Sequence, residues 1–265
     1  MSRNDICWWP MAIVLALSCL GGKAEAKGPR ILLLGDSITM QYSPYVIGQL
    51  KDRVEVYRCR QNSNWTGRLL KELLGDILDA EGCQWDVVWF NVGNWDITPA
   101  AARFIRKKPD WGFVEGKPKT SIPDYEKNMA EIIRRIRQHP PDVQLVFTTT
   151  TFIPRVGAAG AEAFSHAAVK VMQQNGVPVF DLYAATKPHV GLLLYEDNTH
   201  FSKVANETAV IGPYVADALK SFIDTGSLPV AEAAATLPIP KEAIPALEKD
   251  GNVGYLKHRG KSKKK

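Results

Sequence analysis

The sequence predicts an α/β domain built on a five-stranded parallel sheet with helices on both faces. Two observations predict it: short apolar segments typical of buried strands recur along the chain, and longer segments with apolar residues at helical spacing separate them. The 265 residues, 45% hydrophobic and 23% charged, suffice for one such domain. The predicted strands are Ile31–Leu34, Val54–Cys59, Asp86–Gly93, Gln144–Phe152 and Val177–Tyr183.

The clearest predicted helix covers Pro123–Gln138. It has Pro in its first turn and an apolar stripe made by Tyr125, Met129, Ile132, Ile133 and Ile136. The other predicted helices are Thr66–Ala80, Ala161–Gly176, which Asn-Gly closes, and Ser202–Ile223, with a bend near Gly212–Pro213.

The N-terminal 26 residues are predicted to be a secretory signal. An apolar segment follows Arg3, and Ala24–Ala26 supplies small residues at the spacing that signal peptidase requires. An uncleaved anchor is the alternative. We expect a secreted or periplasmic protein with no membrane span after processing. We predict three parts: the signal (1–26), a main domain (27–225) with an insertion at 94–122, and an Ala/Pro-rich extension ending in a basic, disordered tail (226–265).

The positive charge of the chain is concentrated at its C-terminus. The formal charge of +5 arises mainly from 249–265, and the remainder is near neutral. A basic run of this kind is usually a solvated tail. Since nothing in the predicted fold supports nucleic-acid binding, we expect no such partner.

Two cysteines, Cys59 and Cys83, remain after the signal. Cys59 ends a predicted strand, whereas Cys83 lies just before the next one, which places them at opposite ends of a parallel sheet. That separation exceeds the ~7 Å between Cα atoms that a disulfide permits. We expect two free, mostly buried thiols.

Ser37 and His200 are the residues most suited to chemistry. Ser37 directly follows the first strand, and loops that follow parallel strands meet at the edge where ligands bind. Asp197 precedes His200 by three residues, a spacing that lets the carboxylate orient the imidazole. A nucleophilic serine needs such a base and such an acid. The alternatives are a helix-capping serine, a turn aspartate and a surface histidine. No second His or Cys stands at metal-ligand spacing, so we expect no metal.

Three segments together resemble the SGNH hydrolases, also named the GDSL family. They are "GDSIT" after the first strand, "GNWD" after the third and "DNTHFS" before the last helix. The resemblance implies a flavodoxin-like three-layer α/β/α sandwich and hydrolysis of esters, thioesters or amides without a cofactor. It also implies that Ser37 is the nucleophile, His200 the base and Asp197 its orienting acid. The Ser37 N–H and the Asn94 side chain would bind the oxyanion.

The chain departs from this family in the loop after the second strand. The family has a glycine there whose N–H also binds the oxyanion, whereas the best-matching residue here is Asn64. Asn tolerates left-handed backbone conformations, so we expect Asn64 to supply the N–H instead. Asn91 is expected to satisfy backbone groups. Asp36 is expected to accept backbone N–H bonds from neighbouring loops and so to fix the turn that aims Ser37.

The expected function is a secreted esterase that removes an acyl, most simply acetyl, group from a small molecule or polysaccharide. Trp65 and Trp95 adjoin the oxyanion asparagines and are suited to stacking on sugars, although packing is the commoner use of Trp. The insertion, with Arg103, is either a substrate clamp or a solvated segment. The alternatives are a non-catalytic glycan-binding protein on the same fold and an acyltransferase.

Overall fold

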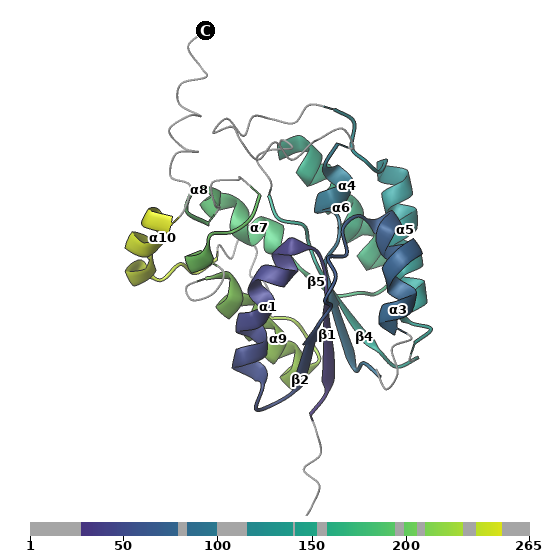
Figure 1. The fold of residues 1–265 in the computed structure, drawn as a ribbon, viewed down its shortest axis with the longest axis horizontal. Helices are drawn as coiled ribbons and strands as arrows, with labels where there is room; N and C mark the ends of the chain where they lie inside the picture. Colours follow the sequence, from purple (N-terminus) through teal and green to yellow (C-terminus); the bar gives the residue numbers. More distant parts are fainter. Residues whose placement is uncertain are drawn as a thin grey trace, which may run out of the picture.

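The protein is a three-layer α/β/α sandwich around a five-stranded parallel sheet, as predicted (Figure 1). The computed structural model describes residues 28–78, 84–99, 116–139, 141–152, 158–193, 199–205, 210–229 and 237–250. The strand order is β2-β1-β3-β4-β5, and all neighbouring pairs are parallel. The strands are β1 (Arg30–Leu34), β2 (Glu55–Arg58), β3 (Val87–Phe90), β4 (Gln144–Thr148) and β5 (Val179–Phe180).

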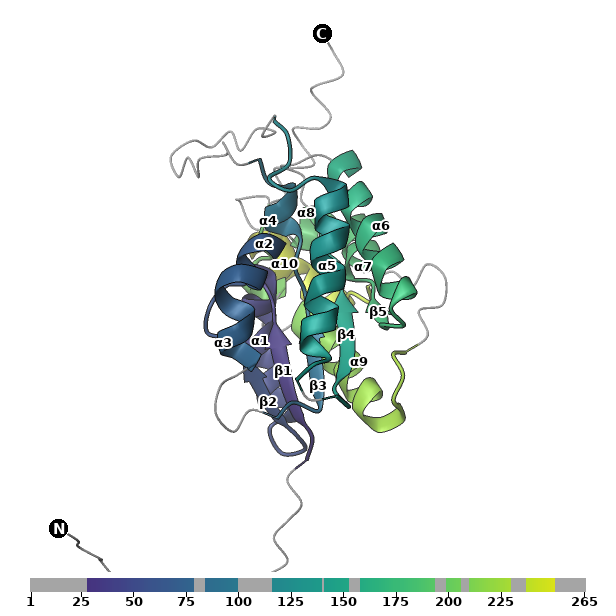
Figure 2. The same cartoon turned by 90° about the vertical axis from the view of Figure 1, so that its right-hand side faces the viewer.

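The helices form two layers with the sheet between them (Figures 1 and 2). One layer contains α1 (Ser37–Leu50) and α9 (Ile211–Thr225), which pack against each other. The other contains α2 (Thr66–Arg68), the π-helical η1 (Leu69–Leu73), α3 (Leu74–Leu78), α5 (Ile122–Ile136) and α6 (Ala158–Gln174). The shorter elements are α4 (Asn94–Ile97), α7 (Leu182–Thr186), η3 (Lys187–His189), α8 (Val190–Leu193), η5 (Lys241–Ala243) and α10 (Ile244–Asp250).

Alternate residues of the strands build two separate cores. In β1, Leu32 and Leu34 pack with the cluster under α3, α5 and α6, whereas Ile31 and Leu33 pack with the cluster under α1 and α9. A strand buried on both faces needs a continuous apolar run, which explains why "ILLL" shows no polar alternation. Burial of each such side chain contributes about 1.5–3 kcal/mol to the folded state.

Two predicted helices differ from those observed. The segment predicted as one helix from Thr66 is α2, η1 and α3 in succession. The helix predicted over Ser202–Ile223 is observed as α9, which begins at Ile211. Pro213 therefore lies in its first turn, where a missing N–H costs nothing, and not at a bend inside a longer helix.

The fifth strand is shorter than predicted. It ends at Phe180, because the Asp181 side chain accepts a hydrogen bond from Ala184 N and starts α7. Leu182 and Tyr183 are therefore helical. A local side-chain cap has overridden the β-like composition of the segment.

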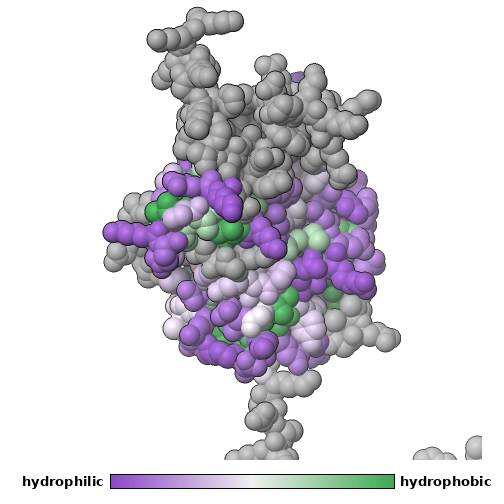
Figure 3. Space-filling view, turned by 60° about the vertical axis from the view of Figure 1, so that its left-hand side comes forward, coloured by the Kyte–Doolittle hydropathy of each residue, from purple (hydrophilic) through white to green (hydrophobic). Residues whose placement is uncertain are grey.

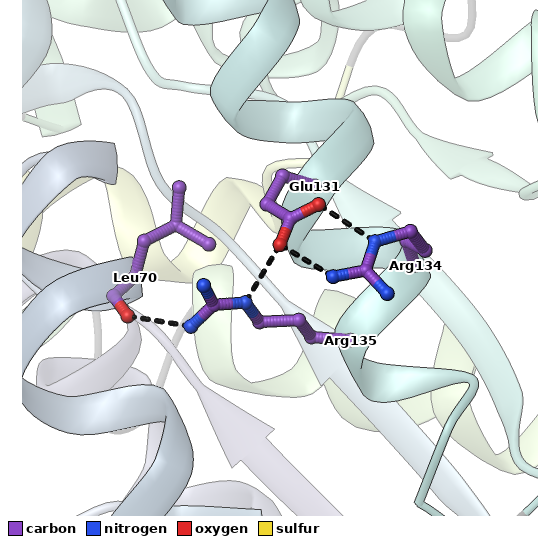
Figure 4. A network of polar contacts seen from close by, with 4 residues as sticks. All are labelled: Leu70, Glu131, Arg134 and Arg135. Carbon is purple, nitrogen blue, oxygen red and sulfur yellow. Dashed lines mark hydrogen bonds and ion pairs between the residues drawn. The ribbon is translucent and has the colours of Figure 1, made fainter.

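A charged network on the surface joins α5 to η1 (Figure 4). Glu131 accepts hydrogen bonds from Arg134 and Arg135, and Arg135 Nη1 donates to the Leu70 carbonyl oxygen at 2.9 Å. The network lies on the outer side of its layer and connects two helices rather than forming a site.

Part of the predicted extension beyond Thr225 packs on the domain. Leu237 and the α10 residue Leu247 are buried, and α10 contacts α8. On the face drawn in Figure 3, the described surface is mostly hydrophilic, with small apolar areas. Tyr57 is the one exposed large hydrophobic residue among those described.

Cys59 is a free, partly buried thiol, and burial raises its pKa. Cys83 lies outside the described residues. Among the helices that the structure describes, none is long and apolar enough to cross a membrane.

Candidate active site

Ser37 is placed by the turn that joins β1 directly to α1. The Asp36 carboxylate accepts a hydrogen bond from Ile38 N at 2.9 Å and so caps the helix that Ser37 begins. Gly35 permits this abrupt turn, because a Cβ there would lie 2.1 Å from Thr39 Oγ1. Asp36 is completely buried, whereas Ser37 is partly exposed at the carboxyl edge of the sheet, the end where the strands finish.

His200 lies beside Ser37, although 163 positions separate them in the chain. His200 Nε2 is 2.8 Å from Ser37 Oγ, a hydrogen-bond distance. The residues after His200 anchor it: Phe201 is buried in the core, and Ser202 N donates to Leu193 O at 2.7 Å. Asp197 lies outside the described residues.

Asn64 has a left-handed backbone conformation, which asparagine tolerates and glycine adopts readily. Its φ is 61°, the only positive φ of a non-glycine residue among those described. The loop adjoins the Ser37 turn, because Ser63 N donates to Gly35 O at 3.0 Å. The Asn64 N–H donates to Asn62 Oδ1 at 2.8 Å, so it already has a partner in this structure.

Asn94 begins α4 at the same edge (Figure 1). Gly93 precedes it with φ 144°, and a Cβ at Gly93 would lie 2.6 Å from Thr150 Cγ2 and 2.7 Å from the Tyr125 hydroxyl. This close packing requires glycine. The Asn94 side chain is buried beside the Asp36 carboxylate, but neither its nitrogen nor its oxygen makes a hydrogen bond of normal geometry to a described group.

Asn91 has a supporting role, as predicted. Its Nδ2 donates to the carbonyl oxygens of Thr148 and Thr149 at 2.9 and 3.1 Å, at the end of β4. This amide therefore holds the carboxyl ends of β3 and β4 together.

Asp36 is also an electrostatic element of the site. Burial raises its pKa to about 6, and the raising is partly offset by the Ile38 N–H, by the charge of His200 and by the nearby Asn94 amide. One carboxylate oxygen, Oδ2, makes no hydrogen bond of normal geometry. The predicted turn-fixing role of Asp36 is confirmed, but the N–H that it binds belongs to its own helix and not to a neighbouring loop.

Trp65 and Trp95 face a common cation. Lys119 Nζ lies 4.2 Å from the Trp65 ring centroid and 5.8 Å from the Trp95 ring centroid, within the range of cation–π contact. The rings thus contact an ammonium group as well as their own loops. Arg103, the third residue predicted to bind substrate, lies outside the described residues.

A family model described as "GDSL-like Lipase/Acylhydrolase family" matches residues 33–207. The match includes Ser37, Asn64, Asn94 and His200, the residues that the fold brings to one edge. The chain belongs to the GDSL-like lipase/acylhydrolase family. It is therefore an enzyme of the GDSL ester hydrolase type, as the resemblance implied. A comparison with curated protein sequences gives no match.

Solved structures share the fold of this GDSL-like enzyme at low sequence identity. The psychrotrophic esterase EstA from Pseudoalteromonas sp. has 12% identity and a TM-score of 0.55, over 74% of this chain and 100% of its own. The acetylxylan esterase Axe2 from Geobacillus stearothermophilus has 17% identity and a TM-score of 0.55, over 74% and 94%. LAE5, an α/β hydrolase from the metagenome of Lake Arreo, has 16% identity and a TM-score of 0.53, over 75% and 96%.

Sequence reasoning did not assign a role to Thr66 and Asp96 of this GDSL-like enzyme. The buried Asp96 carboxylate accepts hydrogen bonds from Thr66 N at 3.0 Å and Thr66 Oγ1 at 2.7 Å, and Asn128 Nδ2 donates to Thr66 Oγ1. These bonds join the loop after β2 to α4, and hence the loop of Asn64 to that of Asn94. The only sequence signal was the acidic residue of "GNWD".

No group of three potential metal ligands occurs in the part of the chain that the structure describes. A hollow of about 540 Å³ lies at the opposite end of the sheet from Ser37, where β3 and β4 begin. Its lining includes Trp85, Asp86, Asp142 and Phe222. It is therefore separate from the candidate active site.

Proposed function

We propose that this GDSL-like enzyme is an exported serine esterase that removes acetyl groups from a carbohydrate. The observation that carries the serine mechanism is the 2.8 Å distance between His200 Nε2 and Ser37 Oγ, which joins two residues distant in sequence. A nucleophile and a base at hydrogen-bond distance are the minimum that acyl transfer to serine requires.

In the proposed mechanism, Ser37 Oγ attacks the acyl carbonyl carbon while His200 takes its proton. His200 then gives that proton to the leaving alcohol, and the acyl group stays on Ser37 as an ester. A water molecule, deprotonated by His200, attacks this ester and releases the acid and the free serine. Asp197 holds the imidazole in the required tautomer.

The oxyanion would accept hydrogen bonds from Ser37 N, Asn64 N and Asn94 Nδ2. The Asn94 amide is suited to this role because it is buried and lacks a partner among the described groups. The Asn64 N–H must leave or share its bond with Asn62 Oδ1 when the oxyanion forms.

The conformation of Asn64 weakens the case for a non-catalytic binding protein. That alternative arose from the absent glycine, but Asn64 has a φ of 61°, a left-handed conformation that glycine also adopts readily. Acyl transfer to a second sugar uses the same residues, and product analysis with an acceptor alcohol distinguishes it from hydrolysis.

Two observations support an acetylated carbohydrate as substrate. Trp65 and Trp95 adjoin the oxyanion asparagines, and the similar fold of Axe2 belongs to an acetylxylan esterase. Export is proposed from residues 1–26 of the sequence. N-terminal sequencing of protein recovered outside the cytoplasm should begin at Lys27. A retained Met1 would contradict cleavage of the signal, and protein found only in the cytoplasm would contradict export.

The deciding experiment is acetate release from a panel of acetylated polysaccharides by the wild type, by Ser37→Ala and by the control Ser221→Ala on α9. We expect release by the wild type and the control, and a fall of at least roughly 10³-fold in Ser37→Ala. A fluorophosphonate should also label the wild type and not Ser37→Ala. Equal release by the wild type and Ser37→Ala on every substrate would refute the mechanism.

A further inference from the structure

Lys119 is a partly buried cation held against the two tryptophans of the candidate site. It belongs to the segment just before α5, and its ammonium lies 4.2 Å from the Trp65 ring centroid and 5.8 Å from that of Trp95. Within the described residues, the ammonium makes no ion pair and no hydrogen bond. Two aromatic contacts thus position a charge that lacks an anionic partner there.

The segment that carries Lys119 is fixed in place. Thr120 N donates to the Asp96 backbone oxygen at 3.2 Å, and Pro118 forms a bridge with Pro99. Ser121 then caps α5 by accepting a hydrogen bond from Asp124 N. The backbone on both sides of Lys119 is therefore anchored, and the ammonium has a defined position.

The two tryptophans that contact this ammonium adjoin the proposed oxyanion residues. Trp65 directly follows Asn64, and Trp95 directly follows Asn94. The Asn64 loop is bonded to the Ser37 turn through Ser63 N and Gly35 O. A substrate whose ester reaches Ser37 therefore presents its neighbouring groups to the surface that contains Lys119.

Asp96, a buried carboxylate whose pKa the charge of Lys119 affects, forms no ion pair with this lysine. Both donor groups of Thr66 bind the Asp96 carboxylate, and the lysine charge lowers the pKa that burial raises. An ammonium that indole rings partly shield from water attracts a further anion more strongly than a solvated one does. Lysine acts as a compact charge, which suits a carboxylate or a sulfate equally.

We propose that Lys119 binds an anionic group, carboxylate or sulfate, on the sugar that carries the acyl ester. This rests on the proposed esterase function and assigns it an acidic carbohydrate as substrate. The alternative is that Lys119 only fastens the segment before α5 to the tryptophans. A purely structural lysine would not make activity depend on the charge of the substrate.

The experiment compares three monoacetylated methyl glycosides that share the acyl group and the leaving oxygen: a glucoside, the matching glucuronide and the matching 6-sulfate. Acetate release is measured with the wild type, Lys119→Met, Lys119→Arg and the control Lys117→Met, an exposed lysine two residues away. Binding of the same compounds to Ser37→Ala, with and without Lys119→Met, is measured by calorimetry.

We expect wild-type kcat/KM to favour at least one acidic sugar by roughly tenfold over the neutral one. Lys119→Met should bring that ratio to about one, whereas Lys119→Arg and Lys117→Met should keep it. The acid that the wild type prefers identifies the bound group as carboxylate or sulfate.

The proposal for Lys119 is overturned, and the esterase proposal left intact, if the wild type hydrolyses acidic and neutral sugars with equal kcat/KM or if Lys119→Met keeps the wild-type ratio. If no substrate is hydrolysed in a Ser37-dependent way, the esterase proposal fails instead. Calorimetry then decides on Lys119: an affinity for acidic sugars that depends on Lys119 supports its role, and any other result overturns it.

Discussion

Asp36 at the carboxyl edge of the sheet and Glu131 on the outer surface of α5 are carboxylates in opposite situations. Hydrogen bonds from Arg134 and Arg135 lower the pKa of Glu131 to about 2, whereas burial raises the pKa of Asp36 to about 6. Glu131 is hydrogen-bonded through both oxygens, but Asp36 Oδ2 lacks a partner. The charges of the surface network are paired with one another, whereas the Asp36 carboxylate is buried without full pairing, which lowers the stability of the folded state.

The neighbours of Asp36 extend this contrast. Both polar atoms of Asn94 and the hydroxyl of Ser63 are buried without hydrogen-bond partners among the described groups. Such groups reduce stability unless a ligand or water engages them. In the candidate site these groups are available to bind a substrate, whereas the polar groups of the α5 network bind one another.

The largest expected effect comes from removing the base at the carboxyl edge. His200→Asn should lower kcat/KM for an acetyl ester by roughly 10³-fold or more, because Ser37 then has no group to take its proton. The double variant Ser37→Ala/His200→Asn should be no slower than either single variant. His166→Asn, an exposed histidine on α6, is the control. Additive losses in the double variant would show that the two residues do not act as a unit.

Neutralising Asp36 should make the protein more stable and less active. The pKa of Asp36 lies near 6 in the folded state against an ordinary value of 3.8, so the folded state binds the proton more tightly. Wild-type stability therefore falls as the pH rises from about 4 to about 6. Asp36→Asn keeps a capping oxygen and should be more stable than the wild type at pH 8, by up to about 3 kcal/mol.

Denaturant unfolding of Asp36→Asn and the wild type at several pH values tests this, and the advantage of the variant should vanish below about pH 4. Its kcat/KM should fall roughly tenfold, because the negative charge favours the imidazolium that forms during the reaction. A variant less stable than the wild type at pH 8 would contradict the expectation.

Asn64 should tolerate glycine but not a β-branched residue. Asn64→Gly should change stability by only a few tenths of a kcal/mol, whereas Asn64→Val should cost about 1–2 kcal/mol, because φ of 61° is unfavourable for valine. Thermal unfolding measures both. If Asn64→Val proves as stable as Asn64→Gly, residue 64 does not have a positive φ in solution. Activity should follow the same order if the Asn64 N–H binds the oxyanion.

Glu131→Gln should have the smallest effect of the set. Arg134 and Arg135, which pair with Glu131, are exposed, and solvent and salt screen their charges. The loss in stability should therefore be slight and should diminish as salt is added. Its kcat/KM should equal that of the wild type. A clear loss of activity would break the contrast between the α5 surface and the site, because it would connect this network to catalysis.

Much of the fold was predictable because its signals are local. The apolar strand segments, the stripe on α5 and the Pro in its first turn all depend on neighbours within a few residues. The predicted boundaries of strands and helices were wrong where a helix cap or a short-range hydrogen bond decides where the element ends. Asp181 ended β5 early, and the segment from Thr66 became a π-helix between two short α-helices. Such endings depend on single hydrogen bonds of about 1 kcal/mol, which composition does not register.

By itself, the sequence determined the three-layer fold, the family and the candidate residues Ser37, Asn64, Asn94 and His200, because a parallel sheet brings the loops at the carboxyl ends of its strands to one edge. Only the tertiary structure decided the 2.8 Å contact of Ser37 with His200, the bonds of Thr66 to Asp96 and the contact of Lys119 with two tryptophans. The first two contacts join residues 163 and 30 positions apart. The third joins loop segments, in which the sequence has no hydrophobic periodicity. Their distances follow from how the layers pack, and no local pattern encodes them.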